Sequence, residues 1–411
     1  MQFIIGQNGQ LLNHRSWVVA VVLCVAMAPG VLRAQAQPDV VWRITGHGDS
    51  VEAVAFSADG TMVASGANAS ASEVHVRSAA DGTLLHTFPG GISGVRSLAF
   101  SPSGETLAVG SIILGWPYPI PAGVADIWDL SSETMLHRFS GGNVSFSADG
   151  TRVASAGQGV NRNIAVHSLP GGADVNDIAT GDQVIAMVLA PNGDIAASSE
   201  YYGEIRLWNV NSGVLLDTLT HGDRPYALAI SPDGALLASG NLAFEGASSI
   251  KVWEVSTGQL IYTLTGDDRF IVSLAFSPNG NLLAAATTST NLGRRIRFLR
   301  VSDGAELASV NPGSAAVNSL EFSPDGRLYV YGSSNGSVTV ARVPLPIEDV
   351  NVDGVVDMLD HATMAACLGG PGVLSPPTGC SASAFAAADL DRDGDVDLRD
   401  HSALQASFAN E

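Results

Sequence analysis

The chain has 411 residues, of which 46% are hydrophobic, and its formal net charge is −20. This length and this hydrophobic content are sufficient for a large core and a small second domain. The acidic balance argues against nucleic acid and against anionic membrane surfaces as partners.

Residues 1–36 have the features of a secretory signal peptide. An apolar run covers residues 17–27, and Ala34-Gln35-Ala36 supplies the small residues of a cleavage site. The alternative is a membrane anchor, which is disfavoured because the run is too short and Pro29 follows it closely. We therefore expect export to the periplasm, the cell envelope or the extracellular space, with no membrane span after cleavage.

A turn of the type Ser-Pro-Asp-Gly, with an apolar run on each side, recurs along most of the chain. Glycine supplies the positive φ that such a hairpin turn requires. The runs around the first turn, 51–56 and 62–65, are apolar at most positions, which indicates strands that are buried on both faces. Seven such turns follow one another about 45 residues apart, at residues 57–60, 101–104, 147–150, 190–193, 231–234, 277–280 and 323–326.

Two further strands follow each turn, for example at residues 205–210 and 215–219. Four antiparallel strands in each of seven units predict an all-β fold over residues 37–343, a seven-bladed β-propeller. The last unit ends at Val343 without a fourth strand, whereas the strand-like run at residues 40–44 has no partner before it. We predict that this N-terminal strand completes the last blade and closes the ring.

The repeats resemble the WD40 family over approximately residues 40–343. The motifs that carry the resemblance are Gly46-His47, Ile127-Trp128-Asp129-Leu130, Leu207-Trp208-Asn209-Val210 and Val252-Trp253-Glu254-Val255. In the other four units, the tryptophan position holds Arg77, His167, Leu299 and Ala341. The resemblance implies a surface for interactions, and the departures imply that the hydrogen-bond relay inside the family's blades is largely missing.

The connections between the second and third strands of each unit vary most, and several contain aromatic residues. In a propeller these connections emerge on one face, where aromatic side chains can anchor a protein or sugar partner. The alternative is that they fold back over a neighbouring blade. The partner-binding candidates are Trp116, Tyr118, Tyr201, Tyr202 and Phe244.

After a short proline linker at residues 344–346, residues 347–411 contain two copies of a calcium-loop pattern. Each copy has oxygen donors at positions 1, 3, 5, 9 and 12, glycine at position 6 and a backbone carbonyl donor at position 7. The alternative, a solvated acidic tail, is disfavoured because twelve acidic residues stand against two basic ones, and such carboxylates repel one another without a cation. We predict two bound Ca²⁺ ions, ligated by Asp349, Asn351, Asp353, Val355, Asp357 and Asp360 and by Asp389, Asp391, Asp393, Asp395, Asp397 and Asp400.

The tandem loops resemble the dockerin module of type I, which implies a small α-helical, EF-hand-like calcium-binding domain with a helix after each loop. The expected helices are residues 360–368 and 400–408. Dockerins of cellulosomes typically carry a small polar pair at positions 10 and 11, where they contact cohesins. Here these positions hold Met358-Leu359 and Leu398-Arg399. The calcium chemistry therefore carries over from the resemblance, whereas the cohesin contact does not.

Cys367 and Cys380 are the two cysteines that remain after removal of the signal peptide. An even pair in an exported chain predicts a disulfide. The alternative is a pair of free thiols, which the oxidising conditions outside the cytoplasm disfavour.

The sequence shows no serine, histidine and aspartate cluster at a nucleophile turn and no histidine spacing suited to zinc. We therefore expect no catalytic residue. We interpret the chain as an exported, monomeric interaction or scaffold protein, whose propeller binds a protein or glycan and whose tail docks it, with a cohesin-like protein among the partners considered. The alternative is a secreted carbohydrate-active or other hydrolytic enzyme. A carboxylate pair that converges at the centre of the propeller would favour this alternative.

Overall fold

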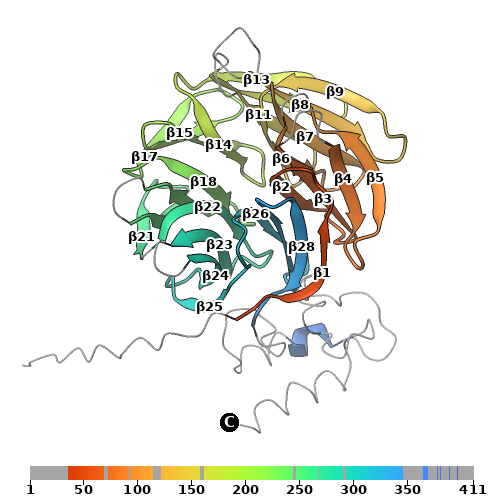
Figure 1. The fold of residues 1–411 in the computed structure, drawn as a ribbon. Coiled ribbons are helices and arrows are strands. Elements are labelled where there is room, and N and C mark those ends of the chain that lie inside the picture. The colour runs from red at the N-terminus through yellow and green to blue at the C-terminus, as the bar shows by residue number, and fades with distance from the viewer. Residues whose placement is uncertain are drawn as a thin grey trace, which may run out of the picture. The chain divides into compact units, whose positions relative to one another are not determined.

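The computed structural model describes residues 36–68, 73–91, 94–113, 122–157, 162–243, 247–266, 268–289 and 293–345, together with residues 364–368, 377, 380, 388 and 396. Within these residues the strands β1 to β28 form seven four-stranded antiparallel sheets. The sheets are arranged as blades around a centre (Figure 1). The predicted seven-bladed β-propeller is thus confirmed.

Each blade contributes an inner, a second, a third and an outer strand. The inner strands are β2 (Val51–Phe56), β6 (Val95–Phe100), β10 (Asn143–Phe146), β14 (Val184–Leu189), β18 (Pro225–Ile230), β22 (Asp268–Phe276) and β26 (Val317–Phe322). The second strands are β3 (Met62–Ala67), β7 (Thr106–Ile113), β11 (Arg152–Ala156), β15 (Ile195–Glu200), β19 (Leu236–Asn241), β23 (Leu282–Ser289) and β27 (Leu328–Ser333). The third strands are β4 (Glu73–Ser78), β8 (Ala122–Asp129), β12 (Asn163–Ser168), β16 (Glu204–Asn209), β20 (Ser249–Glu254), β24 (Gly293–Arg300) and β28 (Ser337–Arg342). The outer strands are β5 (Leu84–Pro89), β9 (Met135–Ser140), β13 (Ala173–Ala179), β17 (Leu215–Thr220), β21 (Leu260–Thr265), β25 (Glu306–Val310) and β1 (Asp39–Thr45).

The hydrophobic core lies between adjacent blades. One cluster joins Val76 and Phe88 of the first blade to Val95 and Leu107 of the second. Another joins Phe298 of the sixth blade to residues of the seventh. Because each sheet is covered on both faces, the inner strands are apolar at most positions instead of alternating.

The turn between the inner and second strands is held by its own side chains. In the first blade, Ser57 Oγ donates to Asp59 Oδ1 at 2.6 Å and accepts from the backbone N–H of Met62 at 2.9 Å. Gly60 adopts a φ of 72°, as the sequence predicts. At the matching turn of the third blade, the hydrogen bond from Ser147 is the main reason that the pKa of Asp149 is lowered to about 2.

The ring closes through the N-terminal strand, as predicted. The order of the last sheet is β1-β28-β27-β26, and β1 pairs antiparallel with β28 from Asp39 opposite Arg342 to Thr45 opposite Ser337. In Figure 1, the red β1 lies beside the blue β28. Pairing with β1 removes the open edge that β28 would otherwise present.

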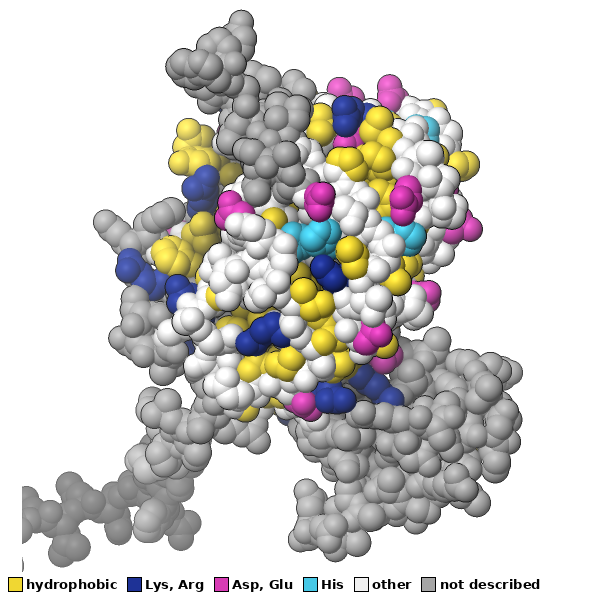
Figure 2. Space-filling model, turned by 45° about the vertical axis from the view of Figure 1, so that its right-hand side comes forward, with side chains coloured by type: hydrophobic (Ala, Val, Ile, Leu, Met, Phe, Trp, Pro, Cys, Tyr) yellow, Lys and Arg dark blue, Asp and Glu magenta, His cyan; other side chains and the backbone are white. Residues whose placement is uncertain are grey.

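All seven outer strands carry a one-residue β-bulge at the same place. In the first blade, Val76 pairs with His86 and Arg77 pairs with Leu84, so that Leu85 is the extra residue. The extra residue is aliphatic in every blade: Val41, Leu85, Leu136, Val175, Leu216, Ile261 and Leu307. Bulges twist an edge strand and hinder pairing with another chain. Apolar side chains also reach the surface in several places in Figure 2, interspersed with charged ones.

No helix within the described part of the chain is both long and apolar enough to cross a membrane. The predicted signal peptide lies outside the described residues, apart from Ala36. This residue forms a parallel bridge with Val310 of β25.

Candidate functional site

The two ends of the propeller carry different connections, because the strands of each blade are antiparallel. One end holds the turns of the Ser-Pro-Asp-Gly type. The other end, called the loop face below, holds the connections between second and third strands and those between consecutive blades. Tyr201 and Tyr202 lie on the loop face between β15 and β16. The other partner-binding candidates, Trp116, Tyr118 and Phe244, lie outside the described residues.

Tyr201 and Tyr202 form a cluster with an arginine that the sequence analysis did not single out. Tyr202 is 81% exposed, and its ring meets that of Tyr201 at a centroid distance of 5.4 Å and an interplanar angle of 78°. Arg224, from the connection between β17 and β18, places its Cζ 4.0 Å from the centroid of Tyr201. A guanidinium at this distance is attracted by the ring, so the cluster presents both aromatic and cationic surface.

A buried ion pair lies at the base of the turn that carries Tyr201 and Tyr202. Glu200, the last residue of β15, is 1% exposed, and its Oε1 accepts from Arg206 Nη1 at 2.9 Å. Arg206 Nη2 also donates to Glu204 at 2.8 Å, on the other side of the turn. Burial outweighs the attraction of Arg206 and raises the pKa of Glu200 to about 7.

Bulges also occur in six of the seven inner strands, close to the loop face. An extra residue in a strand redirects a side chain, and such bulges are frequent near functional sites. The extra residues are Glu52, Arg96, Ile185, Tyr226, Val272 and Asn318, and β22 carries a second bulge at Arg269. The inner strand of the third blade, β10, pairs with β11 without a shift.

Two of these bulge residues meet across the ring. Arg96 belongs to the second blade and Tyr226 to the fifth, so two blades separate them on one side and three on the other. Arg96 Nη1 nevertheless donates to the hydroxyl of Tyr226 at 3.0 Å, and its Cζ lies 5.3 Å from the ring centroid. The contact therefore spans the centre of the propeller.

The boundary between the first and seventh blades is also polar at the centre. Asn318 Nδ2 donates to Ser50 Oγ at 2.7 Å and to Glu52 Oε1 at 3.2 Å. Deeper in the ring, Glu321 Oε2 accepts from the backbone N–H of Phe56 at 3.0 Å. Burial raises the pKa of Glu321 to about 7. Glu52 and Glu321 thus have separate partners, and the raised pKa of Glu321 is not due to a second carboxylate.

The blade-internal hydrogen-bond relay is largely missing among the described residues, as predicted, and a tryptophan-to-serine bond is found in two blades. Trp208 Nε1 donates to Ser198 Oγ at 2.9 Å, and Trp253 Nε1 donates to Ser239 Oγ at 2.8 Å. In both blades the serine lies on the second strand within reach of the tryptophan on the third strand. The buried Nε1 of the third tryptophan, Trp128, has no hydrogen-bond partner among the described residues. The tryptophan position is occupied by other residues in four blades, and in one of them Arg77 Nη1 donates to the carbonyl oxygen of Gly82.

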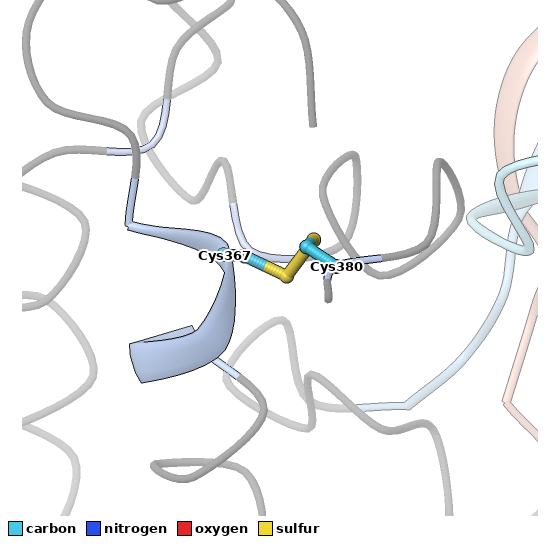
Figure 3. Close-up of a disulfide and its surroundings, with 2 residues drawn as sticks. All are labelled: Cys367 and Cys380. Atoms are coloured by element: carbon cyan, nitrogen blue, oxygen red, sulfur yellow. A yellow bond between two sulfur atoms is a disulfide. The ribbon is translucent and has the colours of Figure 1, made fainter. Parts of the chain in front are cut away.

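The twelve predicted calcium ligands all lie outside the described residues. Within the described part of the tail, residues 364–367 are helical, inside the first predicted helix, and Met364 and Cys367 are buried. A disulfide joins Cys367 to Cys380 (Figure 3). Among the described residues, no group of three or more histidine, cysteine, aspartate or glutamate side chains could hold a metal ion.

One curated protein that matches the chain is "Cell division cycle 20.1, cofactor of APC complex" from Arabidopsis thaliana. It is 29% identical over 182 residues, which cover 41% of this chain and 37% of that protein. The chain therefore spans little more than a third of this relative's length, and the likeness concerns that part alone.

Two family profiles match the chain. The profile "WD domain, G-beta repeat" matches residues 39–72, 82–112, 213–254, 258–292 and 305–340. The profile "Dockerin type I domain" matches residues 347–408, and domains of this type generally bind calcium and a cohesin partner. The chain thus contains WD40 repeats, which form a seven-bladed propeller, and a C-terminal dockerin type I domain.

Proposed function

We propose that this chain is an exported, non-catalytic interaction protein that its dockerin domain attaches to an extracellular assembly of the cellulosome type. The propeller then presents its loop face to a protein or glycan partner. The observation that supports this proposal most directly is the combination of a dockerin domain with an exposed cluster of Tyr201, Tyr202 and Arg224 on the loop face.

The dockerin domain is proposed to hold two Ca²⁺ ions, one in each loop. The oxygen donors of the two loops suit a hard cation, and the neighbouring carboxylates repel one another less when it is bound. At positions 10 and 11, Met358-Leu359 and Leu398-Arg399 replace the small polar pairs of cellulosomal dockerins. We therefore propose a cohesin-like partner whose contact surface is more apolar than usual.

The experiment separates the two binding activities of the full-length protein. Capture by a cohesin-bearing scaffold is measured with calcium and with a chelator. Capture by the extracellular matrix, meaning the insoluble proteins and glycans outside the cell, is measured for the wild type and for Tyr202→Ala. We expect the chelator to abolish the first activity and Tyr202→Ala to weaken the second. Leu216→Ala, a substitution at an exposed outer bulge, is the matched control. Scaffold binding that persists in chelator would contradict the docking proposal, and matrix binding that is indifferent to Tyr202 would contradict the loop-face proposal.

One observation favours the alternative of a secreted hydrolase. Glu321 lies at the centre of the ring, and its pKa of about 7 would suit a general acid. The test is hydrolysis of polysaccharides by the wild type and by Glu321→Gln. Hydrolysis that the substitution abolishes would support the enzyme, whereas absence of hydrolysis in the wild type would leave the interaction protein as the better proposal.

A further inference from the structure

Two groups of arginine and tyrosine side chains on the loop face are linked by nearness in the sequence. In the first group, the exposed Tyr202 contacts Tyr201, and Arg224 lies on the ring of Tyr201. Arg224 lies two positions before Tyr226 at the start of β18, and Tyr226 contacts Arg96 across the centre of the ring. We call these five residues the arginine–tyrosine stripe.

The two arginines of the stripe differ from several other arginines that the structure describes. Arg138, Arg206 and Arg297 are each paired with a carboxylate within 3 Å. Neither Arg96 nor Arg224 forms an ion pair with any described carboxylate. Their positive charges are therefore not neutralised by a described neighbour, although the chain as a whole has a net charge of −20.

Both arginines keep hydrogen-bond donors without a partner among the described residues. Arg224 Nε is buried and has no hydrogen-bond partner among the described residues. Arg96 uses one N–H for the hydroxyl of Tyr226, and a guanidinium has five such donors. Because Tyr201 and Tyr226 hold the two side chains in place, little side-chain entropy remains to be lost when an anion binds.

We propose that the arginine–tyrosine stripe binds an acidic glycan, with sugar rings against the tyrosines and carboxylates on the guanidinium groups. The inference rests on the proposed function of the loop face and specifies its partner. A guanidinium matches a carboxylate with two parallel hydrogen bonds, which a neutral sugar does not offer.

The exposure of Tyr202 favours a glycan over an acidic peptide. At 81% exposure, Tyr202 stands out from the surface with most of its ring accessible. Such a ring suits the flat apolar face of a sugar, to which one side of the ring can stack.

The test uses the full-length protein and three polymers: polygalacturonate, its methyl ester and polyglutamate. Affinity is measured by isothermal calorimetry. We expect polygalacturonate to bind, the methyl ester to bind at least about tenfold more weakly, and polyglutamate to show no saturable binding. Arg224→Gln and Tyr202→Ala should each weaken the binding of polygalacturonate by roughly tenfold.

Arg300→Gln is the matched control, because Arg300 lies at the opposite end of the propeller and pairs with Asp303. Its affinity should equal that of the wild type, and circular dichroism verifies the fold of every variant. Equal binding of polygalacturonate and its ester would overturn the role of the carboxylates. Polyglutamate binding with the same sensitivity to Arg224→Gln would identify an acidic peptide as the partner and also overturn the inference. If none of the polymers binds, the acidic glycan is excluded, while the matrix and scaffold experiments still decide the proposed function.

Discussion

The indole Nε1 of Trp42 donates a hydrogen bond of 2.7 Å to the carbonyl oxygen of Ala79. Trp42 belongs to β1 of the seventh blade, whereas Ala79 follows β4 of the first blade. The side chain is 8% exposed and packs with residues of both blades. The closing strand therefore stabilises the boundary between the first and last blades in addition to completing its own sheet.

Trp42→Ala should lower the free energy of unfolding by about 3–5 kcal/mol, because it removes a large buried side chain. Deletion of residues 37–46 should have a larger effect, since it also exposes the edge of β28. Guanidinium unfolding followed by fluorescence and circular dichroism measures both. Leu216→Ala, at an exposed bulge, should change the stability by less than about 1 kcal/mol. An unchanged free energy of unfolding for the deletion would count decisively against closure through β1.

Glu321→Gln should change how stability depends on pH. Burial raises the folded pKa of Glu321 from 4.5 to about 7, so the folded state holds a proton that the unfolded chain releases between these values. The contribution of Glu321 to the folding stability is therefore greatest below its pKa in the unfolded chain. It is lost as the pH rises through its pKa in the folded state. At about pH 8, the variant should be more stable than the wild type by roughly 1–3 kcal/mol.

Near pH 4, the stability difference between Glu321→Gln and the wild type should be small, since both side chains are then neutral. The amide oxygen of the glutamine can still accept from the backbone N–H of Phe56. Thermal unfolding across this pH range provides the measurement. A difference between variant and wild type that is independent of pH would show that the carboxyl group does not titrate as proposed.

Asp353→Ala and Asp393→Ala should each remove one calcium-binding event from the full-length protein. Each substitution deletes the ligand at position 5 of its loop, and the remaining oxygens hold the cation less strongly. Calorimetric titration of chelator-treated protein should give two events for the wild type and one for each variant. Asp81→Ala, a substitution on the propeller, is the control and should still give two calcium-binding events. Magnesium should substitute poorly, because it demands a smaller octahedral site. A titration without saturable binding in the wild type would rule out both loops as calcium sites.

Cys367 and Cys380 should be oxidised in protein that is recovered from outside the cytoplasm. Alkylation before reduction, followed by mass spectrometry, should leave both cysteines unlabelled. In protein that is retained in a reducing cytoplasm, both should be labelled. Labelling of both thiols in the exported protein would contradict the prediction.

The sequence predicts the architecture well and the centre of the propeller poorly. The evenly spaced turn glycines and the unpaired run at residues 40–44 were sufficient for the blade number and the ring closure. Tyr201 and Tyr202 were predicted as surface residues because they lie in a variable loop. Arg224 was missed because it lies in a connection between blades that carries no distinctive pattern.

The contact between Arg96 and Tyr226 was also beyond the reach of sequence patterns. It depends on two bulges, and a bulge adds one residue to a strand without changing its apolar character. The two residues are also 130 positions apart and in blades that are not neighbours in the ring. A signal was nevertheless present, since Glu52, Arg96 and Asn318 are polar residues at the same place in otherwise mostly apolar inner strands.

Because β1 pairs with β28, the seventh blade of this protein can be completed only late in its synthesis. Asp39 and Arg342 form an ion pair although they are 303 positions apart. The first strand to be made must therefore wait for the last before it gains a partner, and such distant pairing is slow. A chain that stops before β28 leaves β1 unpaired and the seventh blade incomplete. The ring can therefore close only after β28 has been synthesised. A truncated product should expose an open strand edge that proteases can recognise.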